Sequence, residues 1–344
     1  SGRAGLRAPT AAPIIAGEDG DAVAIEIRAK SIINRVPESS PMSFRWTINP
    51  YRGCTHACKY CFARGTHEYL DLDTGRDFDT KIIVKVNAAE LLRKELADPR
   101  WRGDSIAMGT NTDPYQRAEG RYRLMRDIIC GLRDFANPFS ILTKGSLILR
   151  DADVITQAAR VAKVSLAVSV GHVDEQVWRS VEPGTPSPQR RLDVVRRFGD
   201  MGIGCSVLMA PILPELTDSE EQIDQTVRAI ATAGARGVTP VVLHLRPGAR
   251  EWYAAWLVRN HPHLVPRYRE LYKRGSHAAS SYQQLVAARV RQAARRYGID
   301  KPRSGNARNS EDKEAIETQR KSIEKSATEA VQLPLMPAPK MADE

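Results

Sequence analysis

The sequence lacks any run of about 18 consecutive apolar residues, the length that a membrane-spanning helix needs. Its first residues also lack the apolar stretch of a secretory signal. Cysteine is scarce, with five residues among 344, and these do not form the scattered pairs of a disulfide framework. We therefore expect a protein of the reducing cytoplasm that does not enter the membrane.

Acidic side chains are outnumbered, 41 to 51, by lysine and arginine, which gives a formal net charge of +10. A basic surface favours contact with polyanions, because each cation that pairs with a phosphate releases a condensed counterion. The basic residues are dispersed along the chain, and a solvated basic surface explains them equally well. The charge therefore makes nucleic acid a candidate partner and no more.

Three of the five cysteines, Cys54, Cys58 and Cys61, lie within eight residues. Three thiolates on so short a loop can converge on one soft metal centre and leave a coordination position open. The spacing differs from the paired cysteines of zinc sites and from the run found in bacterial ferredoxins. A small zinc site completed by His56 or by a distant ligand is the structural alternative.

The loop also resembles a known family. Its CxxxCxxC pattern, with Tyr60 just before the last cysteine, is similar to that of the radical S-adenosylmethionine (SAM) superfamily. The longer segments 49–64, 109–116 and 141–145 resemble the spore photoproduct lyase-like branch of that superfamily. The resemblance extends over residues 44–247, which is most of the chain outside its two ends.

Short apolar runs alternate with helical patterns through this region, which predicts an α/β fold with a parallel sheet, open or closed into a barrel. Strands are expected at 46–48, 81–86, 105–109, 139–143, 164–170, 204–210 and 241–245. Helices are expected at 88–97, 120–135, 152–162, 189–201, 219–233, 248–260 and 282–297. The resemblance implies that these units form a partial (β/α)6 TIM-like barrel.

The composition suggests four parts. Residues 1–43 are rich in Ala, Gly, Pro and Ser and predict an N-terminal extended arm. The radical SAM core is expected over 44–262, followed by a C-terminal helical extension over 263–300 with Leu285, Val286 and Val290 on one helix face. Residues 301–344 are polar and charged, which predicts a flexible, disordered tail.

The resemblance implies two cofactors. Cys54, Cys58 and Cys61 would bind three irons of a [4Fe–4S] cluster, and the fourth iron would take the amino and carboxylate groups of SAM. An electron donor of the flavodoxin or ferredoxin type would reduce the cluster, and SAM would then be cleaved to a 5′-deoxyadenosyl radical. The protein's part is to orient SAM and to exclude water.

Four further residues are candidates for contact with SAM by the same resemblance. Lys144 and Ser169 match positions that contact SAM in spore photoproduct lyase, and Gly109 with Thr110 lies where the superfamily offers backbone carbonyls to the amino group. Tyr60 would cover the cluster or the adenine. The alternatives are a solvated lysine at a loop edge and an aromatic side chain that only packs.

Strand alternation adds two candidates for ligand contact. In the run Val241-Val242-Leu243-His244-Leu245-Arg246, the odd-numbered apolar residues would pack against helices, which turns His244 and Arg246 toward the barrel lumen. A histidine on a strand is more often a hydrogen-bonded core residue. The loop 182–186, before Arg190 and Arg191, is either a lid over the barrel mouth or a plain connector.

One feature departs from the lyases. They place a hydrogen-donating cysteine at the end of the second strand, whereas the matching stretch 109–113 contains none. This argues against thymine-dimer repair by the route of the lyase. Cys130 and Cys205 are expected to pack in the core.

The tail contains the run Gln332-Leu333-Pro334-Leu335-Met336, which resembles the short peptides that dock bacterial repair proteins on the sliding clamp. Taken together, these patterns predict a radical SAM enzyme that abstracts hydrogen, with DNA or another nucleic acid as substrate in repair or modification. The alternatives are the same chemistry on a small molecule or peptide, and a non-catalytic, metal-containing module that binds nucleic acid.

Overall fold

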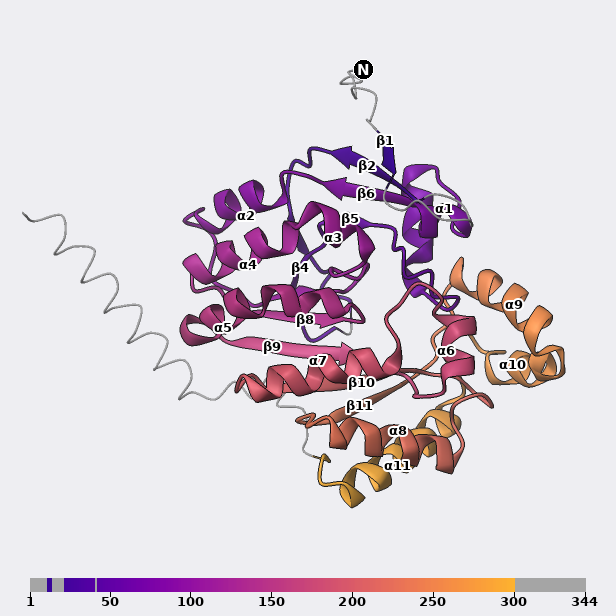
Figure 1. Cartoon of the computed structure of the whole chain (residues 1–344). Helices are drawn as coiled ribbons and strands as arrows, with labels where there is room; N and C mark the ends of the chain where they lie inside the picture. The colour runs from indigo at the N-terminus through magenta and orange to yellow at the C-terminus, as the bar shows by residue number, and fades with distance from the viewer. Residues whose placement is uncertain (1–10, 14–21, 41, 301–344) are drawn as a thin grey trace, which may run out of the picture. The chain divides into compact units, whose positions relative to one another are not determined.

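Parallel β-strands form the larger of two sheets in the computed structural model, which describes residues 11–13, 22–40 and 42–300 (Figure 1). The flexible tail predicted over 301–344, with its clamp-like peptide, lies outside the described residues. Within the described part of the chain, no helix is both long enough and apolar enough to cross a membrane.

Seven strands build the larger sheet in the order β11-β10-β9-β8-β7-β4-β3. The six from β11 to β4 run parallel, and β3 pairs antiparallel with β4 at the edge. The strand order leaves β11 and β3 as the two edges, so the described part of the sheet does not close on itself. This confirms the partial six-unit barrel. The strands are β3 (Ile33–Arg35), β4 (Trp46–Ile48), β7 (Ile106–Met108), β8 (Phe139–Thr143), β9 (Val164–Ser169), β10 (Cys205–Ile212) and β11 (Val238–Val242).

A smaller sheet has the order β1-β2-β6-β5 and contains a strand that we predicted within the barrel alternation. The run 81–86 becomes β6, which pairs parallel with β2 and antiparallel with β5. A short apolar run predicts a strand but not the sheet that it joins. Residues 22–35, assigned to the N-terminal arm, contribute β2 here and β3 to the larger sheet. The strands are β1 (Ala11–Pro13), β2 (Val23–Ile27), β5 (Tyr51–Arg52) and β6 (Lys81–Lys85).

Helices after the strands cover one face of the larger sheet (Figure 1). Helix α7 packs on β9 and β10, and α4 lies between α2 and α5. Local signals explain where helices begin, since the Ser219 hydroxyl and the Gln222 amide form a capping box at α8. These helices are α2 (Ala88–Leu96), α3 (Arg117–Tyr122), α4 (Leu124–Asp134), α5 (Ala152–Val161), α7 (Pro188–Asp200) and α8 (Glu220–Thr232).

The helix predicted over 120–135 is broken at Arg123. This residue has φ +52°, in the left-handed region, and separates α3 from α4. The buried carboxylate of Glu119 accepts a hydrogen bond from the Met125 N–H at 3.2 Å, in the first turn of α4. A side chain from one helix therefore satisfies a free donor of the next.

The remaining helices lie either in the connections between strands or after β11, the last strand. The C-terminal helix α11 packs on α8 and β11, as Figure 1 also shows. Val286 and Val290 are buried in this contact as predicted, but Leu285 is 48% exposed, so its placement on the packed face was wrong. These elements are η1 (Phe62–Leu70), α1 (Arg76–Thr80), η2 (Ser146–Asp151), α6 (Glu175–Val181), α9 (Ala249–Asn260), η3 (Pro262–Leu264), α10 (Val265–Leu271) and α11 (Ser280–Arg296).

The carboxyl ends of the parallel strands meet at one edge of the sheet, on the side where α6 lies (Figure 1). Ligand sites of parallel barrels form at this edge, because the loops after the strands converge there. The cysteine loop 54–61 follows β5 and hydrogen-bonds to the end of α6, through the Lys59 N–H and the Val181 carbonyl at 2.9 Å. The fold therefore brings the predicted metal loop to the ligand-binding edge.

Candidate active site

The three clustered cysteines lie on the loop between β5 and η1. Cys54 and Cys58 are buried and Cys61 is partly buried, and all three are free thiols. Burial raises the pKa of each thiol above its ordinary value, and the carboxylate of Asp113 adds to the rise at Cys54. Binding of a soft metal centre would deprotonate these thiols, because thiolates are the ligands that such a centre prefers.

Gln116 holds the start of this loop from the end of the segment 109–116. Its side-chain Oε1 accepts from the Thr55 N–H at 3.0 Å, and its Nε2 donates to the Gly53 carbonyl at 3.0 Å. The side chain is fully buried. It thus pairs with the loop backbone as a neighbouring strand would, which fixes the loop without adding charge.

Arg64 holds the other end of the loop. Its guanidinium donates to the Cys58 carbonyl at 3.0 Å and to the carboxylate of Asp79 at 2.8 Å. The side chain is fully buried and lies over the Trp252 ring at 4.8 Å. The resemblance included Arg64 and Gln116 in its motifs, but only the fold shows what they do.

A buried carboxylate, Glu182, lies at the centre of the site. It accepts hydrogen bonds from the Tyr60 hydroxyl and from the Arg191 guanidinium, and its Oε1 lies 3.9 Å from Lys144 Nζ. Lys144 Nζ also donates to Ser169 Oγ at 2.7 Å. We call this set, Tyr60, Lys144, Ser169, Glu182 and Arg191, the central network. It joins three of the predicted site residues to two that sequence analysis did not assign.

The central network contains two cations, Lys144 and Arg191, and one carboxylate, Glu182. Burial lowers the pKa of Lys144 and raises that of Glu182, while the nearby Arg191 cation opposes the rise at Glu182. Arg191 also donates to the Ser169 carbonyl at 3.0 Å. The two cations and one carboxylate leave a net positive site, which favours an anionic ligand group.

The loop that begins at Glu182 packs directly on the cysteine loop. The Gly184 N–H donates to the His56 carbonyl at 3.1 Å, and a Cβ at position 184 would come within 2.1 Å of the Thr55 carbonyl oxygen. Only glycine fits so close a backbone approach. The loop 182–186 therefore supports the metal loop, which neither of its predicted roles, lid or plain connector, had described.

Asp113 anchors the backbone around Lys144. Its carboxylate accepts from the Lys144 N–H at 2.6 Å and from the Thr143 hydroxyl at 2.5 Å. Its Oδ2 also lies 3.5 Å from His56 Nδ1, and burial lowers the pKa of that imidazole to about 4. Asp113 thus connects the end of β8 to the cysteine loop.

Gly109 and Thr110 lie at the end of β7. Gly109 has φ +86°, and a Cβ there would meet the Leu142 carbonyl oxygen at 1.9 Å, so the position requires glycine. The Thr110 hydroxyl donates to Asn49 Oδ1 at 3.4 Å, next to β4. Both residues therefore lie at the ligand-binding edge between neighbouring strands.

The strand-alternation argument for His244 and Arg246 was wrong, because β11 ends at Val242. Leu243 and Leu245 are buried as predicted, but His244 stacks on His277, with ring centroids 3.9 Å apart. Arg246 is exposed, and its guanidinium lies 5.6 Å from the centroid of the Phe62 ring. Phe62 directly follows Cys61 in the sequence. Arg246 thus reaches the cysteine loop, whereas His244 lies outside the central network.

The donor set suits an iron–sulfur cluster better than a single ion. Among the described residues, no group of three or more His, Cys, Asp or Glu side chains is placed to hold one metal ion. Zinc would gather its thiolates at about 2.3 Å from one point. A four-iron cube binds each thiolate at a separate iron, so its ligands lie further apart.

Comparison with known proteins agrees with this geometry. The family model of the radical SAM superfamily matches residues 48–240. An uncharacterised protein of Mycobacterium tuberculosis is 52% identical over 274 residues, covering 80% of this chain and 81% of its own length. An uncharacterised protein of Methanocaldococcus jannaschii is 29% identical over 202 residues, covering 59% of this chain and 72% of its own. The chain therefore belongs to the radical SAM superfamily.

Among solved structures, spore photoproduct lyase shares the fold. One variant has a TM-score of 0.61 at 16% identity and covers 80% of each chain. Another, with bound AdoMet and dinucleoside spore photoproduct, has the same TM-score and covers 80% of this chain and 79% of its own. The chain is thus a radical SAM enzyme with the lyase-like fold. Its cofactors are a [4Fe–4S] cluster and SAM, and such enzymes require an electron donor.

His172, a buried histidine near the central network, makes the stability of the fold depend on pH. It lies after β9 and is 5% exposed, and burial together with the Arg191 cation lowers its pKa to about 4. The unfolded chain protonates a histidine near pH 6.5, so the stability that the neutral ring provides is lost as pH falls from about 6.5 to about 4.

As the pH falls from about 6.5 to about 4, we expect protonation of His172 to lower the free energy of unfolding by up to about 3 kcal/mol. The change His172→Gln should flatten the pH dependence measured by urea unfolding, whereas His263→Gln, at an exposed position, should leave it unaltered. An equal slope in the wild type and H172Q would contradict this prediction.

Proposed function

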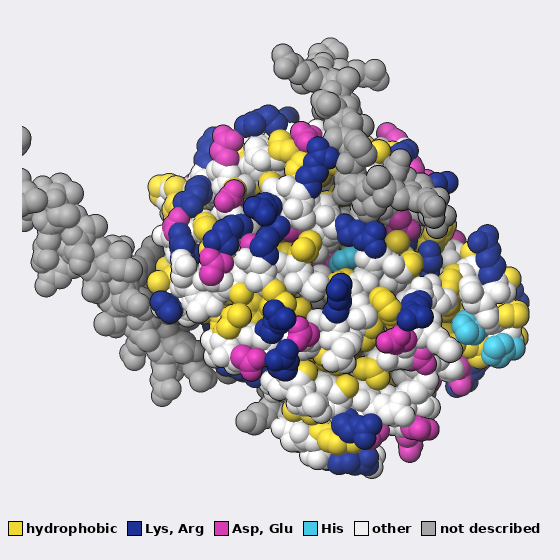
Figure 2. All heavy atoms as spheres, viewed as in Figure 1, with side chains coloured by type: hydrophobic (Ala, Val, Ile, Leu, Met, Phe, Trp, Pro, Cys, Tyr) yellow, Lys and Arg dark blue, Asp and Glu magenta, His cyan; other side chains and the backbone are white. Residues whose placement is uncertain are grey.

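We propose that this radical SAM enzyme abstracts hydrogen from a nucleic acid, in the repair or modification of DNA or RNA. The observation that carries the proposal is the packing of the cysteine loop against the central network at the ligand-binding edge. The net charge of +10 and the dinucleoside ligand of the lyase that shares this fold support a nucleic-acid substrate. Lys and Arg are mixed with Asp and Glu over the face in Figure 2, so charge alone does not locate a binding surface.

Cys54, Cys58 and Cys61 would hold the cluster, with Gln116 and Arg64 keeping the loop in place. When bound, the reduced cluster and SAM supply the 5′-deoxyadenosyl radical that abstracts the hydrogen. Burial of the thiols keeps water from this point of the site. Tyr60, fixed by its hydrogen bond to Glu182, would cover the cofactors from one side.

Lys144 would bind the carboxylate of SAM and Ser169 its ribose, because an ammonium and a hydroxyl already lie within 2.7 Å of each other there. The backbone carbonyls at Gly109 and Thr110 would accept from the SAM amino group. Glu182 positions Lys144, and Arg191 positions Ser169, each by direct contact. Arg246, beside Phe62, would contact the cofactor side of the substrate.

The step in which a hydrogen atom returns to the substrate radical would differ from that of a lyase that uses a cysteine as hydrogen donor. Of the two thiols outside the metal loop, Cys130 lies on α4 and Cys205 begins β10, at the end opposite the ligand-binding edge. Burial raises the pKa of Cys205 to about 12. Neither position suits a thiol that must reach a substrate radical.

Further partners follow from the same function. A flavodoxin or ferredoxin in the cytoplasm would reduce the cluster. The peptide 332–336, which lies outside the described residues, would dock the enzyme on the sliding clamp. Both stay predictions from the sequence and the family.

The metal loop is tested by replacing Cys61 with alanine. We expect C61A, after anaerobic reconstitution, to lose the iron, the sulfide and the visible absorbance of a [4Fe–4S] cluster, because three thiolates are needed to hold it. Cys130→Ala, at a thiol on α4, should retain all three. Zinc in place of iron and sulfide in the reconstituted wild type would overturn the assignment.

The SAM-binding role of Lys144 is tested by Lys144→Gln. Loss of the charge-assisted contact should weaken SAM binding about ten-fold or more while iron and sulfide contents stay at the wild-type level. Lys163→Gln, at an exposed position where β9 begins, is the matched control. If K144Q and the control bind SAM with equal affinity, Lys144 does not bind the SAM carboxylate.

The substrate class is tested by the release of 5′-deoxyadenosine from SAM under anaerobic reduction. We expect single-stranded DNA or RNA to be the hydrogen donor. The measurement is the transfer of deuterium from a deuterated DNA or RNA strand to 5′-deoxyadenosine. Transfer only from a peptide or a small metabolite would replace the nucleic-acid substrate and leave the radical chemistry intact.

A further inference from the structure

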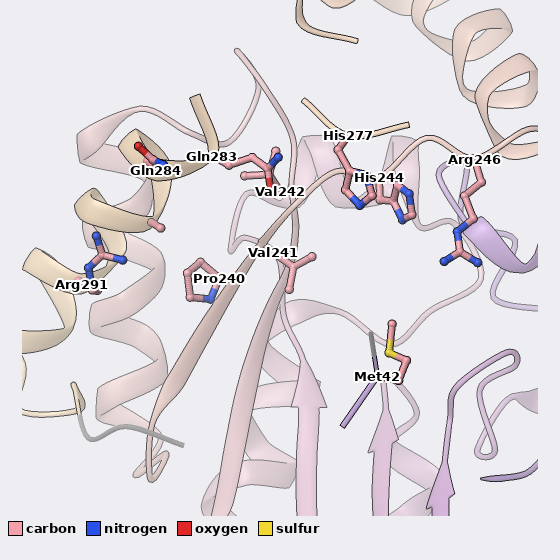
Figure 3. Close-up of a pocket in the computed structure, with 11 residues that line it drawn as sticks. Met42, Pro240, Val241, Val242, His244, Arg246, His277, Gln283, Gln284 and Arg291 are labelled. Atoms are coloured by element: carbon pink, nitrogen blue, oxygen red, sulfur yellow. The ribbon is translucent and has the colours of Figure 1, made fainter. Parts of the chain in front are cut away.

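A cavity of about 570 Å³ lies between the last strand of the sheet and the C-terminal helix (Figure 3). Its volume is within the range of small-molecule sites in proteins. It is lined from β11, from α11, from the segments that follow β11 and precede α11, and from Met42, which precedes β4. The lining residues are Met42, Pro240, Val241, Val242, His244, Arg246, His277, Gln283, Gln284, Ala287 and Arg291. The cavity thus lies beside β11, one of the two edge strands of the larger sheet.

The lining carries positive charge and no carboxylate. Arg246 and Arg291 are its charged residues, and neither forms an ion pair within the described part of the chain. Three other arginines of α11 are paired instead, with Glu220, Asp300 and Asp224; they are Arg289, Arg295 and Arg296. The unpaired guanidinium groups therefore face the cavity, where an anionic ligand would meet them.

Planar and apolar groups complete the lining. His244 and His277 stack with an interplanar angle of 18°, and a backbone bridge joins the two residues. His277 is exposed, so one face of the pair is open to a ligand. Burial and the nearby His277 and Arg246 lower the pKa of His244 to about 4, which keeps that ring neutral. Stacked rings beside exposed Met42 and Val241 suit a nucleobase.

The cavity also reaches the site of the chemistry. Arg246 lines it and at the same time lies over Phe62, the residue that follows Cys61. Figure 3 shows His244 and Arg246 on the segment after β11, with Arg291 on the helix across the cavity. His277, from the segment between α10 and α11, lies against His244. A ligand that extends from Arg291 past His277 would therefore lead toward the cysteine loop.

We propose that this cavity binds a nucleotide unit of the substrate strand, with a phosphodiester at Arg291 and a base stacked on His277. The adjoining sugar and base would then lie on the Arg246 side, next to the cysteine loop. This proposal rests on the proposed nucleic-acid function and adds the place and the contacts of the substrate. Gln284 supplies an amide group for the base edge or the backbone. Gln283 donates its Nε2 to the Ala278 carbonyl at 2.7 Å and supplies its Oε1.

The test uses the reconstituted full-length enzyme and fluorescein-labelled homotetranucleotides of each of the four DNA bases, with binding measured by fluorescence anisotropy over a range of salt. Arg291→Gln should weaken binding about ten-fold and reduce the slope of log affinity against log salt by about 0.7, because one phosphate contact to a single strand is lost. Arg295→Gln, on the same helix but outside the cavity lining, is the matched control.

His277→Ala should weaken binding about ten-fold without a change of the salt slope, because stacking on a base does not depend on counterion release. His277→Phe should restore binding, which separates stacking from damage to the fold. Replacing the phosphodiesters of the probe by uncharged methylphosphonates should abolish the difference between the wild type and R291Q.

Two outcomes would contradict the proposal in different ways. If the tetranucleotides bind and R291Q, H277A and R295Q all match the wild type, the cavity is not the substrate site, and the proposed function stands. If no tetranucleotide and no longer DNA or RNA strand binds the enzyme, the nucleic-acid substrate is wrong, and this site is wrong with it.

Discussion

A buried carboxylate surrounded by two cations and a phenol is the interaction on which the site depends. Glu182 is removed from water, so its charge is tolerable only because Arg191 and Lys144 lie beside it and Tyr60 donates to it. Removing any one partner would leave an uncompensated buried charge or an unsatisfied donor. The same contacts set the positions of the Lys144 ammonium and the Tyr60 ring, so the electrostatic requirement of the core also arranges the groups that would face SAM.

The cysteine loop is held by neutral backbone contacts in addition to this charged centre. The Gln116 amide pairs with the loop as a strand would, and the close approach of Gly184 brings the Glu182 loop against it. A metal loop has to keep its thiols in place before the cluster arrives, and these contacts do so without competing for the sulfur atoms. The open side of the barrel then leaves room for a substrate, since β11 and β3 are not joined in the described sheet.

Much of the fold follows from local patterns. The strand predicted over 139–143 is identical to β8, and the helix predicted over 88–97 differs from α2 by one residue at its end. Errors occurred where a pattern has two meanings. The run 81–86 reads as a strand of either sheet, and the alternation after Val241 continues beyond the point where the chain leaves the sheet. Periodicity reports which side chains are buried, and here Leu243 and Leu245 are buried in a loop rather than a strand.

The spacing of the three cysteines predicted a soft metal centre, because a metal loop places its ligands within a few residues of one another. The cofactors themselves followed from the resemblance that this loop and the residues around it carry. The partners of that loop could not be predicted in the same way. Tyr60 and Glu182 are separated by 122 positions in the sequence. The stacked histidines 244 and 277 are separated in the sequence by α9, η3 and α10. Such pairs depend on how distant segments pack, and packing is a property of the folded chain that no short pattern contains.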